Sequence, residues 1–250
     1  TIDYHNRIYR GKDLTNRFKS GDLESDMAAR VIRDVFIGDY FTLSLPNPKN
    51  TSQTLTITFR VAIFFPNGTS YMIGIVPDTS IIGSSTIQWN TTNTVTGAYK
   101  SSAIHTFLQS NDFRNSMTSM LNGSSFIVPT TSWYITKEIA ADIMSGNGIN
   151  INGQVPNYVS ASIYSAMCMS EVEVYGSRIW SSAGPDNANK YHGQLPLFKH
   201  NPSLIIPKDK SYYLRSVNSN NYVCCVDTYG QCVVIAPSTN EGCRPIIYIR

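Results

Sequence analysis

Apolar residues recur at helical spacing in two parts of this chain. The first series steps by four residues through Leu23, Met27, Val31 and Val35. This spacing brings the four side chains to one face and predicts a helix over residues 23–35.

A second apolar series predicts a helix from about residue 101 to residue 121. Its apolar side consists of Phe107, Leu108, Phe113, Met117, Met120 and Leu121. The Asn-Gly pair at 122–123 is a stop signal for this helix.

Runs rich in β-branched and aromatic residues predict three consecutive strands, at 40–45, 54–65 and 71–77. Turn formers separate them, with Pro-Asn-Pro-Lys-Asn at 46–50 and Pro-Asn-Gly-Thr at 66–69. Because both connections are short, we expect the three strands to form an antiparallel meander.

Less regular patterns predict the remaining segments. They are a strand within 1–20, a Thr- and Asn-rich linker at 84–97, a strand at 125–128, a strand or helix at 132–144, a loop at 145–155, an apolar core segment at 161–180 and a Pro-punctuated loop at 191–207.

The closing residues 212–250 combine two apolar ends with a polar middle. The ends, at 212–215 and 242–249, predict strands. Between them the chain is rich in Asn, Ser, Thr and Tyr, which supply adaptable hydrogen bonds and contact area at low entropic cost. The contrast predicts a rigid framework with a polar, aromatic surface, which favours recognition over chemistry.

Together these elements predict an α+β fold in a single domain over 1–250. Within it we expect an N-terminal strand and helix at 1–38, the meander, a helix and loops at 39–160, and a core with a C-terminal display sheet at 161–250.

Composition supports a β-rich structural protein. Charged residues make up 15% of the chain, against roughly 25% in an ordinary soluble domain. Between Ser44 and Thr136 the only charged side chains are Lys49, Arg60, Asp78, Lys100, Asp112 and Arg114. Ser, Thr and Asn replace them, as in many virion, fibre and adhesin proteins, although the same bias also occurs in β-rich domains from AT-rich genomes.

Charge and hydropathy exclude two further classes. The net charge of +3 is small and dispersed, so we expect no nucleic-acid partner. No apolar run approaches 18 residues, and no charged segment followed by an apolar run is visible, so we expect neither a membrane span nor a secretion signal.

The five cysteines are Cys168, Cys224, Cys225, Cys232 and Cys243. Because no Cys-x-x-Cys spacing occurs and histidine is scarce, we expect no zinc site. Small buried apolar side chains are the simplest interpretation. A disulfide between one of the 224–225 pair and either later cysteine stays open.

The candidate catalytic groups form no known signature. The histidines stand in unrelated contexts, and the glycine-rich residues 145–155 lack the strand–turn–helix setting of a phosphate loop. Glu171 and Glu173 could act as paired carboxylates for glycoside cleavage. We favour a buried ion pair with Arg215 or Arg244. Ser170 could cap a short helix here, although Val172 and Val174 alternate with the acids as they would in a strand.

Three blocks carry a resemblance to a known family. They are RGKDLTNRFKSGDLESDMAARVIRDVFIGDYF, MSEVEVYGSRIWSSAGPD with QLPLF, and YYLRSV with CRPIIYI. Over most of its length the chain resembles virion structural proteins of phages and prophages of clostridia and other gut Firmicutes. Their last domain resembles the C-type lectin fold in the version shared with formylglycine-generating enzymes.

The resemblance implies a C-type-lectin-like fold with twisted antiparallel sheets, two main helices and long loops. In such proteins the C-terminal sheet often displays a ligand-binding face, which retroelements diversify in some members. The matching positions are Asn218, Ser219, Asn220, Asn221, Tyr222, Asp227, Tyr229, Gln231, Ser238 and Asn240. Ordinary hairpin turns at 218–221 and 237–240 are the alternative interpretation.

Two departures from that family limit the expected chemistry. The Glu-Pro-Asn and Trp-Asn-Asp motifs of calcium-dependent lectins do not occur, so we expect no calcium-mediated sugar binding. The cysteines match no copper-binding pattern of formylglycine-generating enzymes, so we expect no cofactor, no metal and no enzymatic activity.

The expected function is therefore that of a phage virion protein in a tail fibre, baseplate or capsid fibre, exposed on the particle. It would bind a bacterial surface receptor, glycan or protein, or other virion proteins, as a homo-oligomer such as a trimer. A purely structural decoration or assembly protein and a formylglycine-generating-type enzyme are the alternatives.

Overall fold

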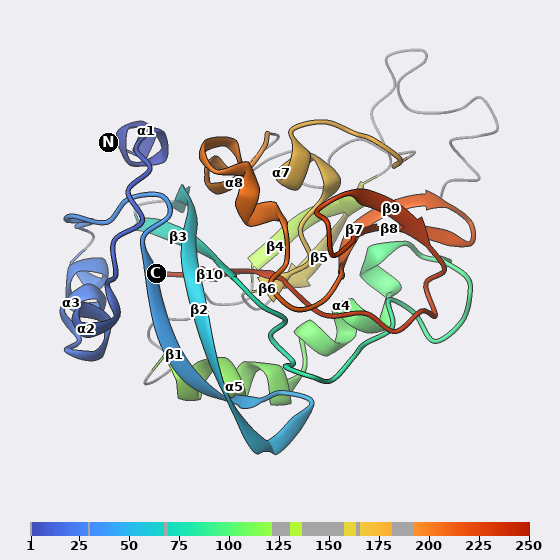
Figure 1. The fold of residues 1–250 in the computed structure, drawn as a ribbon, viewed down its shortest axis with the longest axis horizontal. Helices are drawn as coiled ribbons and strands as arrows, with labels where there is room; N and C mark the ends of the chain where they lie inside the picture. Colours follow the sequence, from blue (N-terminus) through green and yellow to red (C-terminus); the bar gives the residue numbers. More distant parts are fainter. Residues whose placement is uncertain are drawn as a thin grey trace.

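The computed structural model describes residues 2–29, 31–67, 70–121, 131–136, 158–163, 166–181 and 193–250. Its centre is a five-stranded antiparallel sheet in the order β1-β2-β3-β10-β6. The strands are β1 (Tyr40–Asn47), β2 (Asn50–Asn67), β3 (Ser70–Pro77), β10 (Ile246–Ile249) and β6 (Ala166–Met167). The last strand of the chain thus lies inside the sheet, between β3 and β6 (Figure 1).

The predicted meander is confirmed as β1, β2 and β3, and all three strands are longer than expected. Along β1 the side chains of Phe41, Leu43 and Leu45 are buried and alternate with more accessible ones. This period of two places one face of the strand in the core. The turn between β1 and β2 is tight, since Asn47 pairs with Asn50.

Two smaller sheets complete the β structure. β4 (Thr131–Thr136) pairs with β5 (Tyr158–Ile163), and β7 (Tyr212–Ser219), β8 (Tyr222–Val226) and β9 (Cys232–Ile235) form a three-stranded antiparallel sheet. The three-stranded sheet lies toward the end of the molecule that is remote from the N-terminal helices (Figure 1). The strands predicted at both ends of 212–250 are confirmed within β7 and β10.

The strand expected near the N-terminus is wrong, because residues 2–7 form the helix α1 (Ile2–Arg7). Alternation over so few residues does not distinguish the two elements. Tertiary contacts fix the helix: His5 Nδ1 lies 2.9 Å from the Val35 carbonyl oxygen, and the Asn6 amide exchanges two hydrogen bonds with the backbone of Phe64 in β2.

The helix predicted over 23–35 is too long. The structure has α2 (Thr15–Lys19) followed by α3 (Asp22–Ala28), and beyond it the chain turns toward the sheet. Asp34 has a positive φ of 48° and is held by Arg10 and Lys12. After this turn, Val35 is completely buried in the core.

The single helix predicted over 101–121 is also wrong, because the segment divides into η1 (Tyr99–Ser101), α4 (Ala103–Leu108) and α5 (Asn111–Met120). Two serines separate the elements. Ser102 Oγ accepts from the His105 N–H (3.1 Å) and Ser110 Oγ accepts from the Phe113 N–H (3.2 Å). Each hydroxyl satisfies an otherwise free N–H at a helix start, so each begins a new helix.

A loop was predicted over residues 191–207, but the described part of this segment, from residue 193 on, is not a loop. It contains α8 (Pro196–His200) and η4 (Pro202–Ile205), each with proline in its first turn. Proline has no N–H to leave unsatisfied there, and its φ suits the helix. The core segment predicted at 161–180 contains parts of β5, then β6 and α7 (Glu171–Tyr175).

The segment predicted as a linker, 84–97, is irregular but tied to the C-terminal residues. Ile87 forms a bridge with Glu241, the Asn90 N–H donates to the Pro237 carbonyl (3.0 Å), and Trp89 Nε1 donates to Leu214 O in β7 (3.1 Å). Trp89 is fully buried. These contacts fasten the three-stranded sheet to the body of the molecule.

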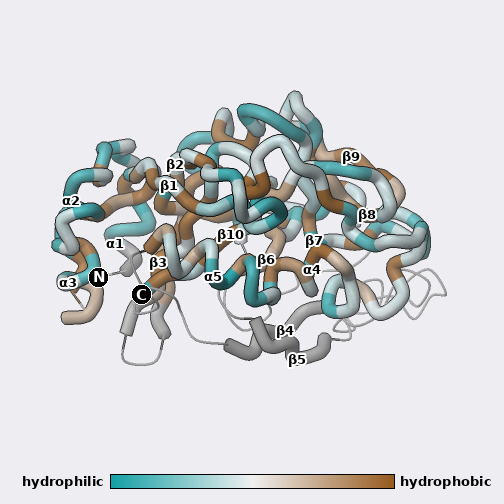
Figure 2. The backbone as a smooth tube through the Cα atoms, turned by 90° about the horizontal axis from the view of Figure 1, so that it is seen from below, coloured by the Kyte–Doolittle hydropathy of each residue, from teal (hydrophilic) through white to brown (hydrophobic). Residues whose placement is uncertain are grey.

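The apolar residues gather along the central sheet and the elements around β10 (Figure 2). All four residues of β10 are buried. The structure combines antiparallel sheets with helices, so the predicted α+β class is confirmed. No helix in the described part of the chain is long and apolar enough to cross a membrane.

Some predictions fall where the structure gives no description. The strand expected at 125–128 and the loop expected at 145–155 lie outside the described residues, and of the segment 132–144 only the part within β4 is described.

Candidate functional site

Eight of the ten residues that the sequence predicts as ligand-binding lie on the strands or turns of the β7–β9 sheet, the other two follow β9, and none of the ten is buried. They do not form one face, because the two hairpin turns leave β8 at opposite ends. The β7–β8 turn group contains Asn218, Ser219, Asn220, Asn221 and Tyr222, and the β8–β9 turn group contains Asp227, Tyr229 and Gln231. Ser238 and Asn240 follow β9. Five residues of β8 separate the groups by roughly 13 Å.

The β7–β8 turn group is joined by a segment that sequence reasoning did not include. The Val95 N–H donates to Asn220 O (3.1 Å), and Ser238 Oγ hydrogen-bonds to Asn93 Oδ1. The Asn221 amide, in the orientation that its neighbours favour, donates to the backbone oxygen of Asn93 at 2.9 Å. Amide and hydroxyl groups from three segments therefore meet at this end of the sheet.

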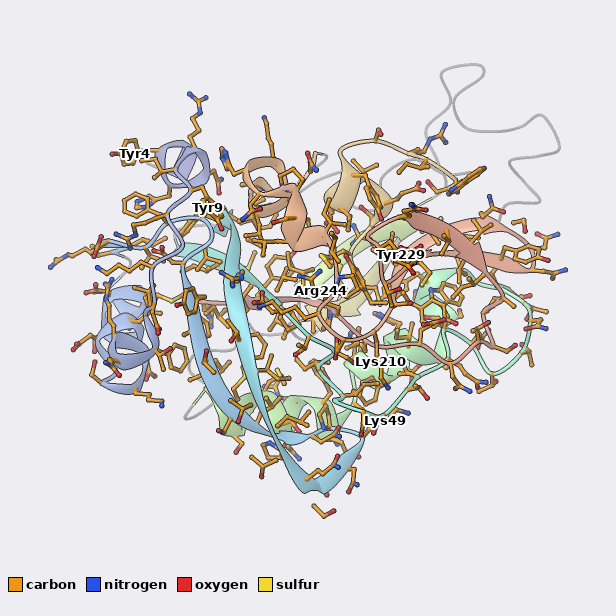
Figure 3. The ribbon with its side chains drawn as sticks, in the orientation of Figure 1. Tyr4, Tyr9, Lys49, Lys210, Tyr229 and Arg244 are labelled. Carbon is orange, nitrogen blue, oxygen red and sulfur yellow. The ribbon has the colours of Figure 1, made fainter. Side chains whose placement is uncertain are left out.

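In the β8–β9 turn group, Asp227 has a structural role. Its Oδ1 accepts from the backbone N–H groups of Tyr229 (2.9 Å) and Gln231 (2.8 Å), which closes the turn. Tyr229 is 78% exposed and projects from the turn, remote from Tyr4 and Tyr9 at the N-terminal end (Figure 3).

Exposed apolar side chains reveal further candidates. Eight large ones are exposed in the described residues: Tyr4, Tyr9, Ile179, Trp180, Ile206, Tyr222, Tyr229 and Val234. All but the first two lie on or beside the β7–β9 sheet. Trp180 is 52% exposed and Tyr222 is 48% exposed, although buried positions are the rule for such large side chains.

Trp180 lies against the sheet in a defined position. Its indole Nε1 donates to Cys232 O in β9 (3.0 Å), and Asn218 Nδ2 donates to Trp180 O (2.6 Å). Its backbone N–H donates to Glu171 Oε1 (2.7 Å). We define Trp180, Asn218, Tyr222 and Val234 as the display surface.

Register explains why these side chains share a face. Val226 pairs directly with Cys232, and Cys224 with Val234. Since alternate residues of a strand point to the same side, Tyr222 and Cys224 project to the face of Cys232 and Val234. The Trp180 N–H and both cysteine thiols donate to the same atom, Glu171 Oε1, so the display surface lies beside the two cysteines.

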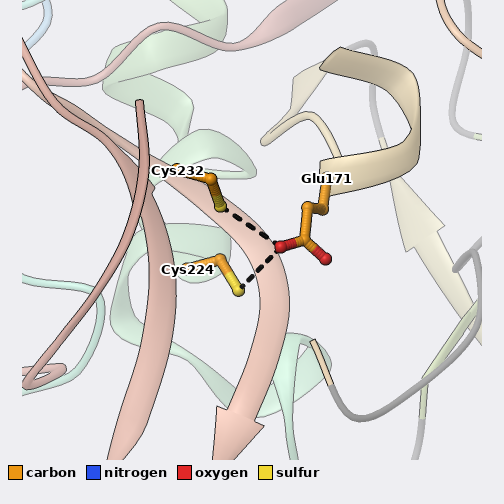
Figure 4. A group of neighbouring side chains, drawn as sticks. All are labelled: Glu171, Cys224 and Cys232. Carbon is orange, nitrogen blue, oxygen red and sulfur yellow. Dashed lines mark hydrogen bonds between the residues drawn. The ribbon is translucent and has the colours of Figure 1, made fainter. Parts of the chain in front are cut away.

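Below the display surface, Glu171 is completely buried at the start of α7 and meets both thiols (Figure 4). Cys232 Sγ lies 3.2 Å and Cys224 Sγ 3.7 Å from Glu171 Oε1. The other oxygen, Oε2, accepts from the Ser181 N–H (3.0 Å) and from the Ser181 hydroxyl. Cys232 is the more accessible of the two cysteines.

Burial acts to raise the pKa of Glu171, but the hydrogen bonds from Ser181, Trp180, Ile179 and Cys232 outweigh it and lower the pKa below its ordinary value. The carboxylate is therefore ionised at neutral pH. The five cysteines are all free thiols in the structure. The expectation of small buried side chains is confirmed for Cys168, Cys224, Cys225 and Cys243, whereas Cys232 is half-buried. Cys224 and Cys232 also contact the charged Glu171.

The predicted ion pair is confirmed for Glu173. Its Oε2 lies 2.7 Å from Arg215 Nη1, and both residues are almost completely buried. Ser170 and Glu173 form a capping box at α7, in which Ser170 Oγ accepts from the Glu173 N–H and Glu173 Oε2 accepts from the Ser170 N–H. Of the two alternatives that the sequence leaves open for this segment, the short helix with Ser170 as its cap is therefore the one that forms.

Arg244 does not pair with either glutamate. It donates to the backbone oxygens of Pro77 (2.6 Å) and Leu204 (2.8 Å), and its guanidinium lies 5.1 Å from the centroid of the Tyr212 ring. Its side chain is buried, two residues before β10, and links this part of the chain to η4 and to the end of β3 (Figure 3). Its role is structural, as the sequence predicted, but with carbonyl partners.

Comparison with known families gives one match. A family described as a domain of unknown function, DUF6273, matches residues 72–250. The matched residues run from β3 to β10, and they contain the display surface, the Glu171 cluster and the Glu173–Arg215 pair. No curated protein and no solved structure matches this chain. Because the match extends over well above half of its length, the chain belongs to the DUF6273 family.

Proposed function

We propose that this chain is a structural protein of a bacteriophage virion, in a tail fibre, baseplate or capsid fibre, and that its display surface binds the bacterial host. The observation that carries the proposal is the concentration of exposed aromatic and apolar side chains beside the β7–β9 sheet. Exposed apolar surface of this kind marks interaction sites.

The chemistry of the display surface suits recognition. Trp and Tyr bring large rigid contact areas with a polar edge and recur among the residues that dominate binding energy. Here Asn218 and the amides of the β7–β8 turn surround them and supply directional hydrogen bonds. Such a surface fits the flat apolar face and ring hydroxyls of an envelope saccharide, or a protein receptor.

The position of Trp180 further supports binding. Three hydrogen bonds fix it: its indole donates to Cys232 O, its backbone N–H donates to Glu171, and its carbonyl accepts from Asn218. A side chain that is held in place before binding loses little entropy on contact. Weak single sites gain avidity when several copies engage one cell, so the proposal includes a homo-oligomer, such as a trimer.

We also propose a C-type-lectin-like arrangement for the domain. In support, the last strand lies inside the central sheet, and a separate small sheet carries the polar turns. The same contacts favour binding over glycoside cleavage, because Glu173 is paired with Arg215 and Glu171 is bound by Ser181 and Trp180. Neither carboxylate is free to act as a general acid.

The test uses labelled full-length protein and intact cells of the strain that hosts the phage, with unbound protein washed away. We expect retention on the cells and a loss of at least about 30-fold in affinity for Trp180→Ala, as for an interface residue worth 2 kcal/mol. Tyr222→Ala should act in the same direction. Tyr4→Ala, an equally exposed tyrosine on α1, should bind as the unchanged protein does.

Two results would count against the proposal. One is no retention on any envelope, and the other is equal binding by the Trp180 and Tyr4 variants. If Trp180→Ala instead prevents the chain from associating with itself or with isolated virions, the display surface is an assembly interface. Tyr229→Ala reports separately on the β8–β9 turn group.

A further inference from the structure

Three atoms of metal-ligand type converge beneath the display surface. Glu171 Oε1, Cys224 Sγ and Cys232 Sγ all lie within 4.8 Å of one another (Figure 4). They come from α7, β8 and β9. We propose that these three side chains form a binding site for Zn²⁺ or a similar thiophilic divalent cation, independently of what the display surface binds.

The distances fit a tetrahedral ion. Zinc bonds of about 2.3 Å to sulfur and about 2.1 Å to oxygen imply ligand separations of about 3.6 Å from sulfur to oxygen in a tetrahedron. The observed separations are 3.2 Å for Cys232 and 3.7 Å for Cys224. Each sulfur therefore lies within a few tenths of an ångström of the separation from Glu171 Oε1 that a shared ion requires.

The carboxylate is oriented by groups outside the cluster. Ser181 binds Oε2 with its N–H at 3.0 Å and with its hydroxyl, which leaves Oε1 directed at the two thiols. Such outer hydrogen bonds fix the ligands of metal sites and contribute substantially to affinity. The Trp180 N–H at Oε1 also offsets part of the negative charge that two thiolates and a carboxylate would bring.

In the free protein the two thiols serve as hydrogen-bond donors to Glu171. The pKa of Cys224 is raised by its hydrogen bond with Cys232, by burial and by the charge of Glu171. A divalent cation would take the place of the two thiol protons, which are released on binding, so affinity should rise with pH. Three protein donors leave the fourth position to water, and the accessible Cys232 marks the entrance.

No Cys-x-x-Cys spacing indicates this site in the sequence. The two thiols occupy neighbouring strands, and Glu171 precedes Cys224 by 53 residues. Only the β8–β9 register brings the cysteines to one face, where Cys225 points the other way.

The test uses reduced full-length protein freed of metal, titrated with Zn²⁺ against a chromophoric chelator. We expect one equivalent of Zn²⁺ per chain. Native mass spectrometry should show a mass gain of one zinc less two protons. Titration with Co²⁺ should give a thiolate-to-cobalt charge-transfer band in the near ultraviolet, which requires sulfur ligands.

Cys232→Ser is the matched variant, because Cys232 is half-buried and the change is small. It should weaken Zn²⁺ binding at least about 100-fold, since even the loss of an outer hydrogen bond costs 10–100-fold. Cys225→Ala is the control on the same strand and should keep full binding. The absence of the cobalt band in the unchanged protein, or equal zinc binding by it and Cys232→Ser, would overturn the proposal even if a variant misfolded.

Discussion

At the scale of single residues, the Glu173–Arg215 pair shows how a buried charge is made tolerable in this core. The carboxylate accepts from Arg215 and from the Ser170 N–H, and Arg215 Nη1 also donates to Cys168 O at 2.7 Å. Each charge thus has both an opposite charge and a backbone partner. A pair of this kind is costly to break from one side, because the other charge is then left buried alone.

We therefore expect Arg215→Met to lower the free energy of unfolding by about 3–5 kcal/mol. Adding Glu173→Gln removes the remaining charge and keeps an acceptor for the Ser170 N–H. The double variant should be more stable than Arg215→Met alone, as measured by urea denaturation. If Glu173→Gln lowers the free energy of unfolding further, the unpaired Glu173 charge was not the cause of the instability of Arg215→Met.

His105 gives a second prediction at this scale. It is buried on α4 with its ring edge-on to Tyr99 at 4.8 Å, and burial, with a smaller effect from Lys100, lowers its pKa from 6.5 to about 4. The unfolded chain therefore binds a proton between these pH values that the folded chain does not. The contribution of neutral His105 to the free energy of unfolding is therefore fully present above about pH 6.5. It is lost as the pH falls to about 4, by up to about 3 kcal/mol.

His105→Phe keeps a ring of similar size and does not titrate. The stability of the unchanged protein relative to this variant should fall between pH 7 and pH 4, as measured by urea unfolding at each pH. The comparison cancels the other groups that titrate in this range. A difference that stays constant with pH would show that the folded histidine protonates normally.

The same scale explains what could be predicted about the site. The pairing of Glu173 with an arginine followed from a charge inside an apolar segment, because such a charge needs a partner. The meeting of Glu171 with two thiols could not follow, since it depends on strand register and on the path of residues 176–181. The exposure of Trp180 could not be predicted either, because the sequence does not distinguish an exposed tryptophan from a buried one.

At the scale of elements, strands were easier to predict than helices. The connections between β1, β2 and β3 contain clusters of Pro, Asn and Gly, which are strong turn signals. Helix length in 99–121 instead depends on Ser102 and Ser110, and a serine in an apolar series can lie inside a helix or cap it. The local sequence is compatible with one long helix, but in the folded protein the two serine caps divide the segment into shorter helices.

Ser110→Ala tests the cap of α5 directly. The loss of the hydrogen bond to the Phe113 N–H should lower the free energy of unfolding by about 1 kcal/mol. Ser119→Ala, an exposed position within the same helix, should change stability by no more than about 0.5 kcal/mol. Thermal or urea unfolding of both variants checks this, and equal effects would mean that the Ser110 hydroxyl does not act as a cap.

At the scale of the whole molecule, the residues matched by the family do not include the whole central sheet, because β1 and β2 lie outside them. The match begins at Met72, within β3. Yet β3 pairs with β2 along its whole length, from Phe59–Pro77 to Asn67–Ser70. The buried Asp78 also depends on Arg60 of β2 (2.7 Å), together with Lys208.

We therefore expect residues 72–250 alone not to form a cooperatively folded domain. Removal of β1 and β2 turns β3 into an open edge, uncovers apolar side chains of the core and takes one cation from Asp78. The fragment should bind a hydrophobic dye and lack a sharp unfolding transition, as a loosely packed state does. A chain lacking only residues 1–7 keeps the sheet and should unfold cooperatively at a lower denaturant concentration, because it loses the His5 and Asn6 contacts. A sharp unfolding transition of the 72–250 fragment at the denaturant concentration of the full chain would contradict this expectation. It would show that residues 72–250 form a complete domain without β1 and β2.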